Sequence, residues 1–152
     1  LMDLHGVTVG AADSSAVFIS NRTGVWRSRD RGTNWDNLEF PKFTNIFYSR
    51  GVESAPNDPD TLYACVGMNF GSQQGGVMRS TDQGDTWERF DKGVNPASTT
   101  FGVAINEHAP DQVYFCTRKG QVFGTRDGGE TWSSHVLPEM AGNVKASACA
   151  SA

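Results

Sequence analysis

The sequence predicts an all-β fold made of consecutive four-stranded antiparallel sheets, and three observations predict it. An eight-residue turn motif occurs three times along the 152 residues, at nearly regular intervals. Between the copies lie short alternating runs rich in β-branched and aromatic residues, and no stretch has the periodicity of a helix. The 17 glycines and 4 tryptophans suit many short strands joined by tight turns.

Each copy of the motif follows the pattern Ser/Thr-x-Asp-x-Gly-x-Thr-Trp, with Asn34 replacing the threonine in the first copy. The aspartate can accept hydrogen bonds from nearby backbone N–H groups, and the glycine supplies a positive φ. The tryptophan buries a large ring behind the turn. We therefore expect a structural role for Ser28, Asp30, Gly32 and Trp35, for Ser80, Asp82, Gly84, Thr86 and Trp87, and for Thr125, Asp127, Gly129, Thr131 and Trp132.

The aspartates of successive copies lie roughly 50 residues apart, which is about the length of one four-stranded blade of a β-propeller. Each repeat opens with a Gly-Val pair in a predicted inner strand, at residues 6–7, 51–52 and 102–103. The second strand is predicted at 17–20, 62–65 and 113–116, and the third at 25–28, 77–80 and 122–125. The turn motif then leads into a fourth strand, which starts near each tryptophan.

These repeats predict a single β-propeller section over residues 1–152, with blades at approximately 4–40, 49–92 and 100–137. Residues 143–152 have the position of a further inner strand. Propellers have typically about four to eight blades, so about three blades leave a ring open. We expect the ring to be closed by further blades of a longer chain, or by a second copy in a homodimer, and we favour the longer chain.

On these motifs the chain resembles the Asp-box (BNR) repeat β-propellers, and the resemblance covers nearly the whole sequence. The family includes sialidases, some endoglucanases, sortilin-type receptors and photosystem assembly factors resembling Ycf48. In propellers, ligands usually occupy the face that holds the connections from the second to the third strand and from the fourth strand to the next blade. The Asp-box turns are expected on the opposite face.

One loop on the expected ligand face is unusually long. Residues 67–76 replace the short hairpins that the other repeats place at 21–24 and 117–120, and inserted surface loops often carry function. The loop mixes an aromatic ring with amides, a composition suited to sugar or peptide contacts, while the inner strands offer side chains to a central channel. The candidate ligand-binding residues are His5, Arg50, Glu53, Asn69, Phe70 and Gln74.

The composition of this loop on a rigid propeller face favours a noncatalytic binding or scaffold module that recognises a protein or a glycan through its loop face. The alternative is part of a glycoside hydrolase. Sialidases of the family need three clustered arginines, which this chain does not place at matching positions. Endoglucanases of the family use two carboxylates across a cleft, and here Glu53 is the one acid near the predicted channel. No catalytic residue is therefore assigned.

Composition excludes several other classes of function. The net charge of −4 disfavours nucleic acid and anionic membrane surfaces as partners, and no apolar run approaches the roughly 20 residues of a membrane helix. The histidines do not cluster, so no metal site or cofactor is predicted. Cys65 and Cys116 occupy equivalent positions, which favours small buried side chains over a disulfide. An odd, scattered set of cysteines that includes Cys149, with no visible signal peptide, favours the cytoplasm.

Overall fold

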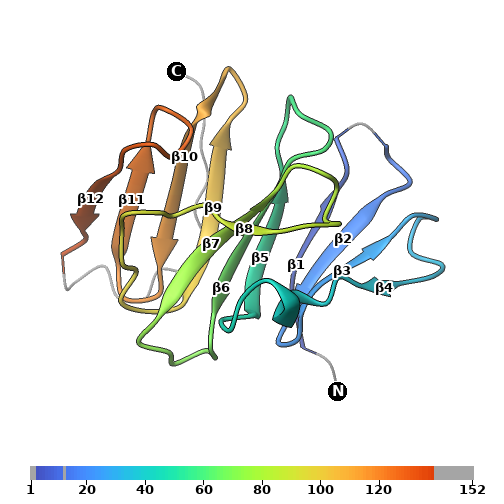
Figure 1. Ribbon diagram of the computed structural model, residues 1–152, viewed down its shortest axis with the longest axis horizontal. Helices are drawn as coiled ribbons and strands as arrows, with labels where there is room; N and C mark the ends of the chain where they lie inside the picture. The colour runs from blue at the N-terminus through green and yellow to red at the C-terminus, as the bar shows by residue number, and fades with distance from the viewer. Residues whose placement is uncertain (1–2, 12, 139–152) are drawn as a thin grey trace.

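The computed structural model describes residues 3–11 and 13–138, and its architecture is all-β. Three four-stranded antiparallel sheets stand side by side (Figure 1), and in each sheet the strands follow one another in chain order. Each sheet is thus a simple meander, as in a propeller blade. The predicted fold class is confirmed. The inner strand predicted at 143–152 lies outside the described residues.

The strands have the following bounds. The first blade holds β1 (Leu4–Val9), β2 (Val17–Asn21), β3 (Gly24–Ser28) and β4 (Asp36–Asn37). The second holds β5 (Tyr48–Ser54), β6 (Leu62–Gly67), β7 (Gly75–Ser80) and β8 (Glu88–Arg89). The third holds β9 (Thr100–Asn106), β10 (Ala109–Thr117), β11 (Gln121–Thr125) and β12 (Ser133–Val136). A single 3-10 turn, η1 (Phe40–Lys42), lies between the first and second blades in the described part of the chain.

Two hydrophobic cores hold the blades together, one at each junction. Leu62, Ala64 and Met78 of the second blade pack toward the first blade, where Phe18 and Val25 meet them. The alternate residues of the same strands face the third blade, because side chains along a strand point to opposite faces. The second core contains Tyr63, Cys65, Val77, Phe90, Val103, Val113, Phe115 and Phe123. All six residues of β6 are consequently buried.

The three Asp-box turns share one hydrogen-bond pattern. In the second turn, the Ser80 hydroxyl donates to Asp82 Oδ1 and accepts from the Gly84 N–H, both at 2.8 Å. Asp82 then accepts the Thr86 N–H at 2.8 Å and the Thr86 hydroxyl at 2.6 Å. The glycine of each turn has a φ close to +90°, at 89, 92 and 94° for Gly32, Gly84 and Gly129, a conformation that favours glycine.

The tryptophans of the turns differ in their surroundings. Trp87 is buried in the first core, where its ring lies 4.7 Å from that of Phe40. Trp132 packs on the second core, with its ring 5.2 Å from Phe115. Trp35 is half-buried and belongs to neither core of the described residues. The second and third tryptophans therefore pack between blades.

Hydrogen bonds within the turns predict acid sensitivity. The backbone N–H of Asn34 is the main cause that lowers the pKa of Asp30 from 3.8 to about 2, and the Thr131 hydroxyl does the same for Asp127. A carboxylate whose pKa is lower in the folded state stabilises the fold above its unfolded pKa. This stabilisation is lost as the pH falls from about 4 to about 2.

We expect the thermal unfolding midpoint of the wild-type protein to fall between about pH 5 and about pH 2. In an Asp127→Asn variant the fall should be smaller, because one of the titrating turns has lost its ionisable group. The amide keeps an oxygen that can accept the Thr131 N–H, so the turn itself is conserved. Circular dichroism followed on heating measures both midpoints. Equal falls in the two proteins would contradict the assignment.

Candidate functional site

The face that carries the long loop is here called the loop face, and it comprises the connections 22–23, 38–47, 68–74, 90–99 and 118–120. In Figure 1 the β2–β3, β6–β7 and β10–β11 connections lie together along the lower edge. The Asp-box turns belong to the other end of the blades. There the Gln83 N–H donates to the Asp60 carbonyl at 2.9 Å, in the connection between β5 and β6. The first and third turns have equivalent bonds.

The long loop is tied both to itself and to the third blade. Asn69 Oδ1 accepts the Gly71 N–H at 2.9 Å, and the Ser72 hydroxyl donates to the Gln74 carbonyl at 2.7 Å. Toward the third blade, the Thr99 hydroxyl donates to the Asn69 carbonyl, and Lys119 Nζ donates to Gln73 Oε1 at 2.8 Å. These bonds fix the loop at the junction of two blades.

Phe70, at the tip of this loop, gathers two guanidinium groups and a second ring around it. We call Arg50, Phe70, Phe101 and Arg118 the Phe70 cluster. The Phe70 and Phe101 rings lie 5.6 Å apart. The Arg50 guanidinium carbon lies 4.7 Å from the Phe101 ring and 5.9 Å from the Phe70 ring, and that of Arg118 lies 5.3 Å from Phe70. Such cation–π contacts hold the side chains in place.

The Phe70 cluster has the chemistry of a binding surface. Phe101 is 5% exposed and supports the cluster from below, whereas Phe70 is 52% exposed. The face of an aromatic ring can stack on an apolar ligand surface. The guanidinium groups beside it carry several N–H donors, which suit hydroxyl or carboxylate oxygens. The cluster thus offers one apolar contact flanked by donors.

The structure brings some of the candidate residues together and separates others. Arg50, Asn69 and Phe70 lie at one site on the loop face, and Gln74 takes part in the loop through its backbone. His5 Nδ1 donates to the Ser49 carbonyl at 2.6 Å, next to Arg50 in the chain. Glu53 lies toward the opposite end of β5, paired in register with Tyr63. Burial raises the pKa of Glu53.

A β-bulge in each inner strand explains where these side chains point. The register of the inner strand shifts between Leu4 and Gly6 in the first blade and between Ser49 and Gly51 in the second. His5 and Arg50 are the residues left over by these shifts. A third shift, opposite Cys116 and Thr117, leaves Phe101 in the same position. Bulges redirect side chains out of the normal alternation, and all three residues directly precede the opening glycine.

Two members of the cluster, Phe101 and Arg118, were not among the predicted site residues. The repeat itself contains a signal for Phe101, because it occupies the position of His5 and Arg50 before the opening glycine. Arg118 has no such signal, since it matches Arg22 in the short hairpin of the first blade, which is not a candidate residue. The alignment of repeats, applied to every position rather than to the insertion alone, would have found Phe101.

The loop face is basic and has no free pair of carboxylates. Its five connections contain the basic residues Arg22, Lys42, Lys92, Arg118 and Lys119. Their two acidic residues are already engaged: Glu39 pairs with Lys42, and the buried Asp91 pairs with Arg89 at 2.7 Å. Glycoside hydrolysis generally requires two carboxylates that flank the bond. The described loop-face connections hold no unpaired carboxylate pair of this kind.

Other chemistries find little support in residues 3–11 and 13–138. No three His, Cys, Asp or Glu side chains gather there as metal ligands do, and none of the helices there is long and apolar enough to cross a membrane. Cys65 and Cys116 are both buried, as their equivalent positions predicted, and they are not joined by a disulfide. Burial raises the pKa of the Cys65 thiol well above its usual value, which makes it a poor nucleophile at neutral pH.

Comparison with known proteins gives related sequences of two kinds. A family profile described as sortilin, neurotensin receptor 3 (Sortilin-Vps10) matches residues 75–149. The chain is 30% identical over 94 residues to an oligoxyloglucan-reducing end-specific xyloglucanase of Emericella nidulans, a match that covers 58% of the chain. It is 34% identical over 123 residues to a xyloglucanase of a Paenibacillus species, which covers 72% of the chain. The chain spans 12% of the length of each of these enzymes.

Solved structures agree on the fold. An ancestral GH74 enzyme superposes with a TM-score of 0.72 at 18% identity, over 91% of this chain and 19% of that one. A YCF48 bound to a D1 peptide superposes with a TM-score of 0.62 at 12% identity, over 88% of this chain and 40% of that one. At such identities the likeness concerns the fold alone. Together with the three Asp-box turns and the profile match, it shows that the chain belongs to the Asp-box (BNR) repeat β-propellers.

Proposed function

We propose that this chain is a blade section of a xyloglucan-hydrolysing propeller, and that its loop face binds the polysaccharide. The observation that carries the proposal is the identity of 30% and 34% to two xyloglucanases. The Phe70 cluster supports it, because the C–H faces of glucose units stack on aromatic rings while arginine N–H groups reach the sugar hydroxyls. The catalytic carboxylates would lie outside the described loop-face connections.

The test measures binding rather than turnover. Xyloglucan oligosaccharides should bind the 152-residue protein in calorimetric titrations. Phe70→Ala should weaken binding by about 2- to 10-fold, the equivalent of one aromatic contact. Val9→Ala is the control, since Val9 is an exposed apolar residue at the end of β1 away from the loop face, and its affinity should stay at the wild-type value. No binding, or equal affinity in all three proteins, would refute the proposal.

A second candidate function is noncatalytic recognition of an acidic protein segment. The observation that favours it is the basic charge of the loop face, where both acidic residues are paired within the protein. The YCF48 structure that contains a D1 peptide shows that this fold can hold a peptide. The salt dependence of binding separates the two candidates. Added salt should weaken the affinity for an acidic peptide, because it screens contacts to carboxylates, and should leave the affinity for a neutral glycan almost unchanged.

A further inference from the structure

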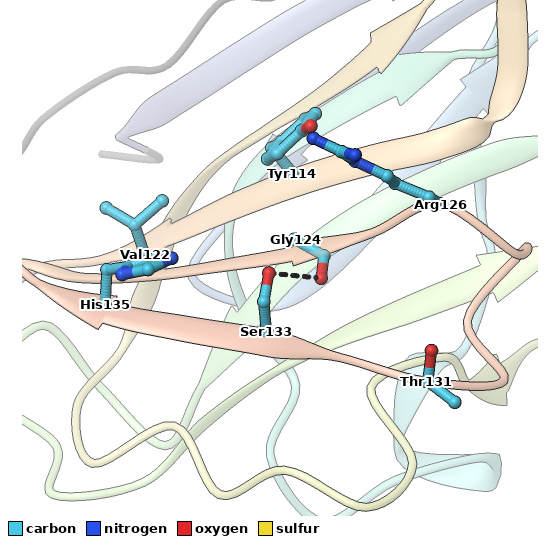
Figure 2. Close-up of a pocket in the computed structure, with 7 residues that line it drawn as sticks. All are labelled: Tyr114, Val122, Gly124, Arg126, Thr131, Ser133 and His135. Atoms are coloured by element: carbon cyan, nitrogen blue, oxygen red, sulfur yellow. Dashed lines mark hydrogen bonds between the residues drawn. The ribbon is translucent and has the colours of Figure 1, made fainter.

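A hollow of about 500 Å³ lies on the outer face of the third blade. Val113, Phe115 and Phe123 of this blade pack toward the second blade. Tyr114, Val122 and Gly124 alternate with them and therefore point the other way. Figure 2 shows the Arg126 side chain extending toward Tyr114, with Val122 and His135 at the far end. The lining residues are Tyr114, Val122, Gly124, Arg126, Thr131, Ser133 and His135.

This face is equivalent to the two faces that are already packed. In the third blade Tyr114 is paired in register with Gly124. The equivalent pairs are Phe18 with Arg27 in the first blade and Tyr63 with Arg79 in the second. Phe18 belongs to the core against the second blade, and Tyr63 to the core against the third. The hollow thus stands where a third junction would form. No described residue packs a further sheet against it.

The first junction shows which groups of the next blade such a face contacts. Arg27 Nη1 donates to the Gln83 carbonyl at 2.7 Å and to Asp85 Oδ1 at 2.8 Å, both in the Asp-box turn of the next blade. Arg29 Nη2 lies 3.6 Å from the same carboxylate. Asp85 is the sixth residue of its turn. At the second junction the sixth residue is Glu130, which lines one hollow together with Arg79. At this second junction Arg79 pairs with Glu88 of its own blade at 2.8 Å, so the pairing across blades is seen at the first junction.

The third face resembles that of the first blade, with one change. Gly124 replaces the arginine of the other two blades, and a Cβ there would lie 2.6 Å from the Tyr114 ring. The cation is instead supplied by Arg126, which is equivalent to Arg29 and exposed. We propose that this face is the docking site of a further Asp-box blade, whose turn carries a carboxylate at its sixth position and pairs it with Arg126.

The chain's own first blade does not meet this requirement, because Thr33 is the sixth residue of its turn. A second copy would therefore dock its first blade without the carboxylate. This makes the first blade a convenient probe, since one substitution supplies the missing group. Aspartate and glutamate already stand at this position in the other two turns, so the Thr33→Asp turn should form normally.

The experiment compares self-association by sedimentation equilibrium. Thr33→Asp should lower the dissociation constant about tenfold relative to the wild-type protein. Adding Arg126→Gln should remove this gain, and the double variant Thr33→Arg, Arg126→Glu should restore it. Asn45→Asp adds the same charge at an exposed position on the loop face and should associate as the wild type does. Circular dichroism verifies that each variant is folded.

Two outcomes would overturn the proposal. One is a Thr33→Asp protein that associates no more tightly than Asn45→Asp, or not at all. The other is a gain that persists when Arg126 is replaced, because association would then use a different surface. A gain that depends on Arg126 and returns when both charges are reversed assigns the docking site to this face.

Discussion

Replacing Phe115 by alanine should lower the free energy of unfolding by about 3 to 5 kcal/mol, the usual cost of removing a buried phenylalanine. Phe115 is fully buried in the core between the second and third blades. Its ring stacks on Phe123 at 4.7 Å and meets Trp132 edge-on at 5.2 Å. Because several rings depend on it, the cavity left behind cannot close by a small shift of one neighbour. Urea unfolding followed by tryptophan fluorescence measures the loss.

Phe70→Ala is the matched control for this measurement. Phe70 is 52% exposed, so its replacement should cost about 1 kcal/mol or less. The same variant serves in the binding experiment, where it must be folded for its lower affinity to mean anything. Equal losses in the two variants would show that the second core contributes less to stability than its burial indicates.

Gly75→Ala should destabilise the protein by about 3 kcal/mol or more, because the added methyl group has no room. A Cβ at Gly75 would lie 2.2 Å from the Ser98 carbonyl oxygen and 2.9 Å from the Thr100 nitrogen. Both are backbone atoms, which cannot rotate away as a flexible side chain can. Gly75 also donates its N–H to the Pro96 carbonyl at 3.1 Å, so the two segments are held at this close approach.

Gly71→Ala, in the connection that directly precedes β7, provides the comparison for Gly75. The nearest atom to a Cβ at Gly71 is Asn69 Oδ1 at 3.7 Å, an ordinary contact distance. Its unfolding free energy should stay within about 1 kcal/mol of the wild-type value. Chemical denaturation of both variants tests the pair. A Gly75→Ala protein as stable as Gly71→Ala would mean that the β7 strand can move away from residues 98–100.

The fold could be predicted from the sequence because its determinants are local. The Asp-box pattern places an acceptor, a positive φ and a large ring within eight residues, and the strands between the turns alternate regularly. Predicted strands such as 62–65 fall inside β6 (Leu62–Gly67). Where alternation is broken, the prediction weakens. The bulges at His5, Arg50 and Phe101 change the direction of the side chains without any local signal that alternation has failed.

The candidate site was only partly predictable for a related reason. Arg50 and Phe70 stood out by their positions on a predicted inner strand and within an inserted loop. Their contacts with Phe101 and Arg118 join segments that are distant in the chain, and no periodic pattern encodes such pairs. Glu53 was grouped with Arg50 because both lie on one inner strand. The two residues between them, Gly51 and Val52, place Glu53 toward the opposite end of that strand.

The middle blade has both faces buried, so its stability is coupled to both junctions between blades. Within the described residues each outer blade is stabilised by one junction, so it can open while the other junction remains intact, as in repeat proteins governed by nearest-neighbour coupling. The middle blade can open only when both cores are lost. The amide hydrogens of β6 therefore exchange with solvent through global unfolding, whereas those of the outer blades exchange through partial openings of lower free energy.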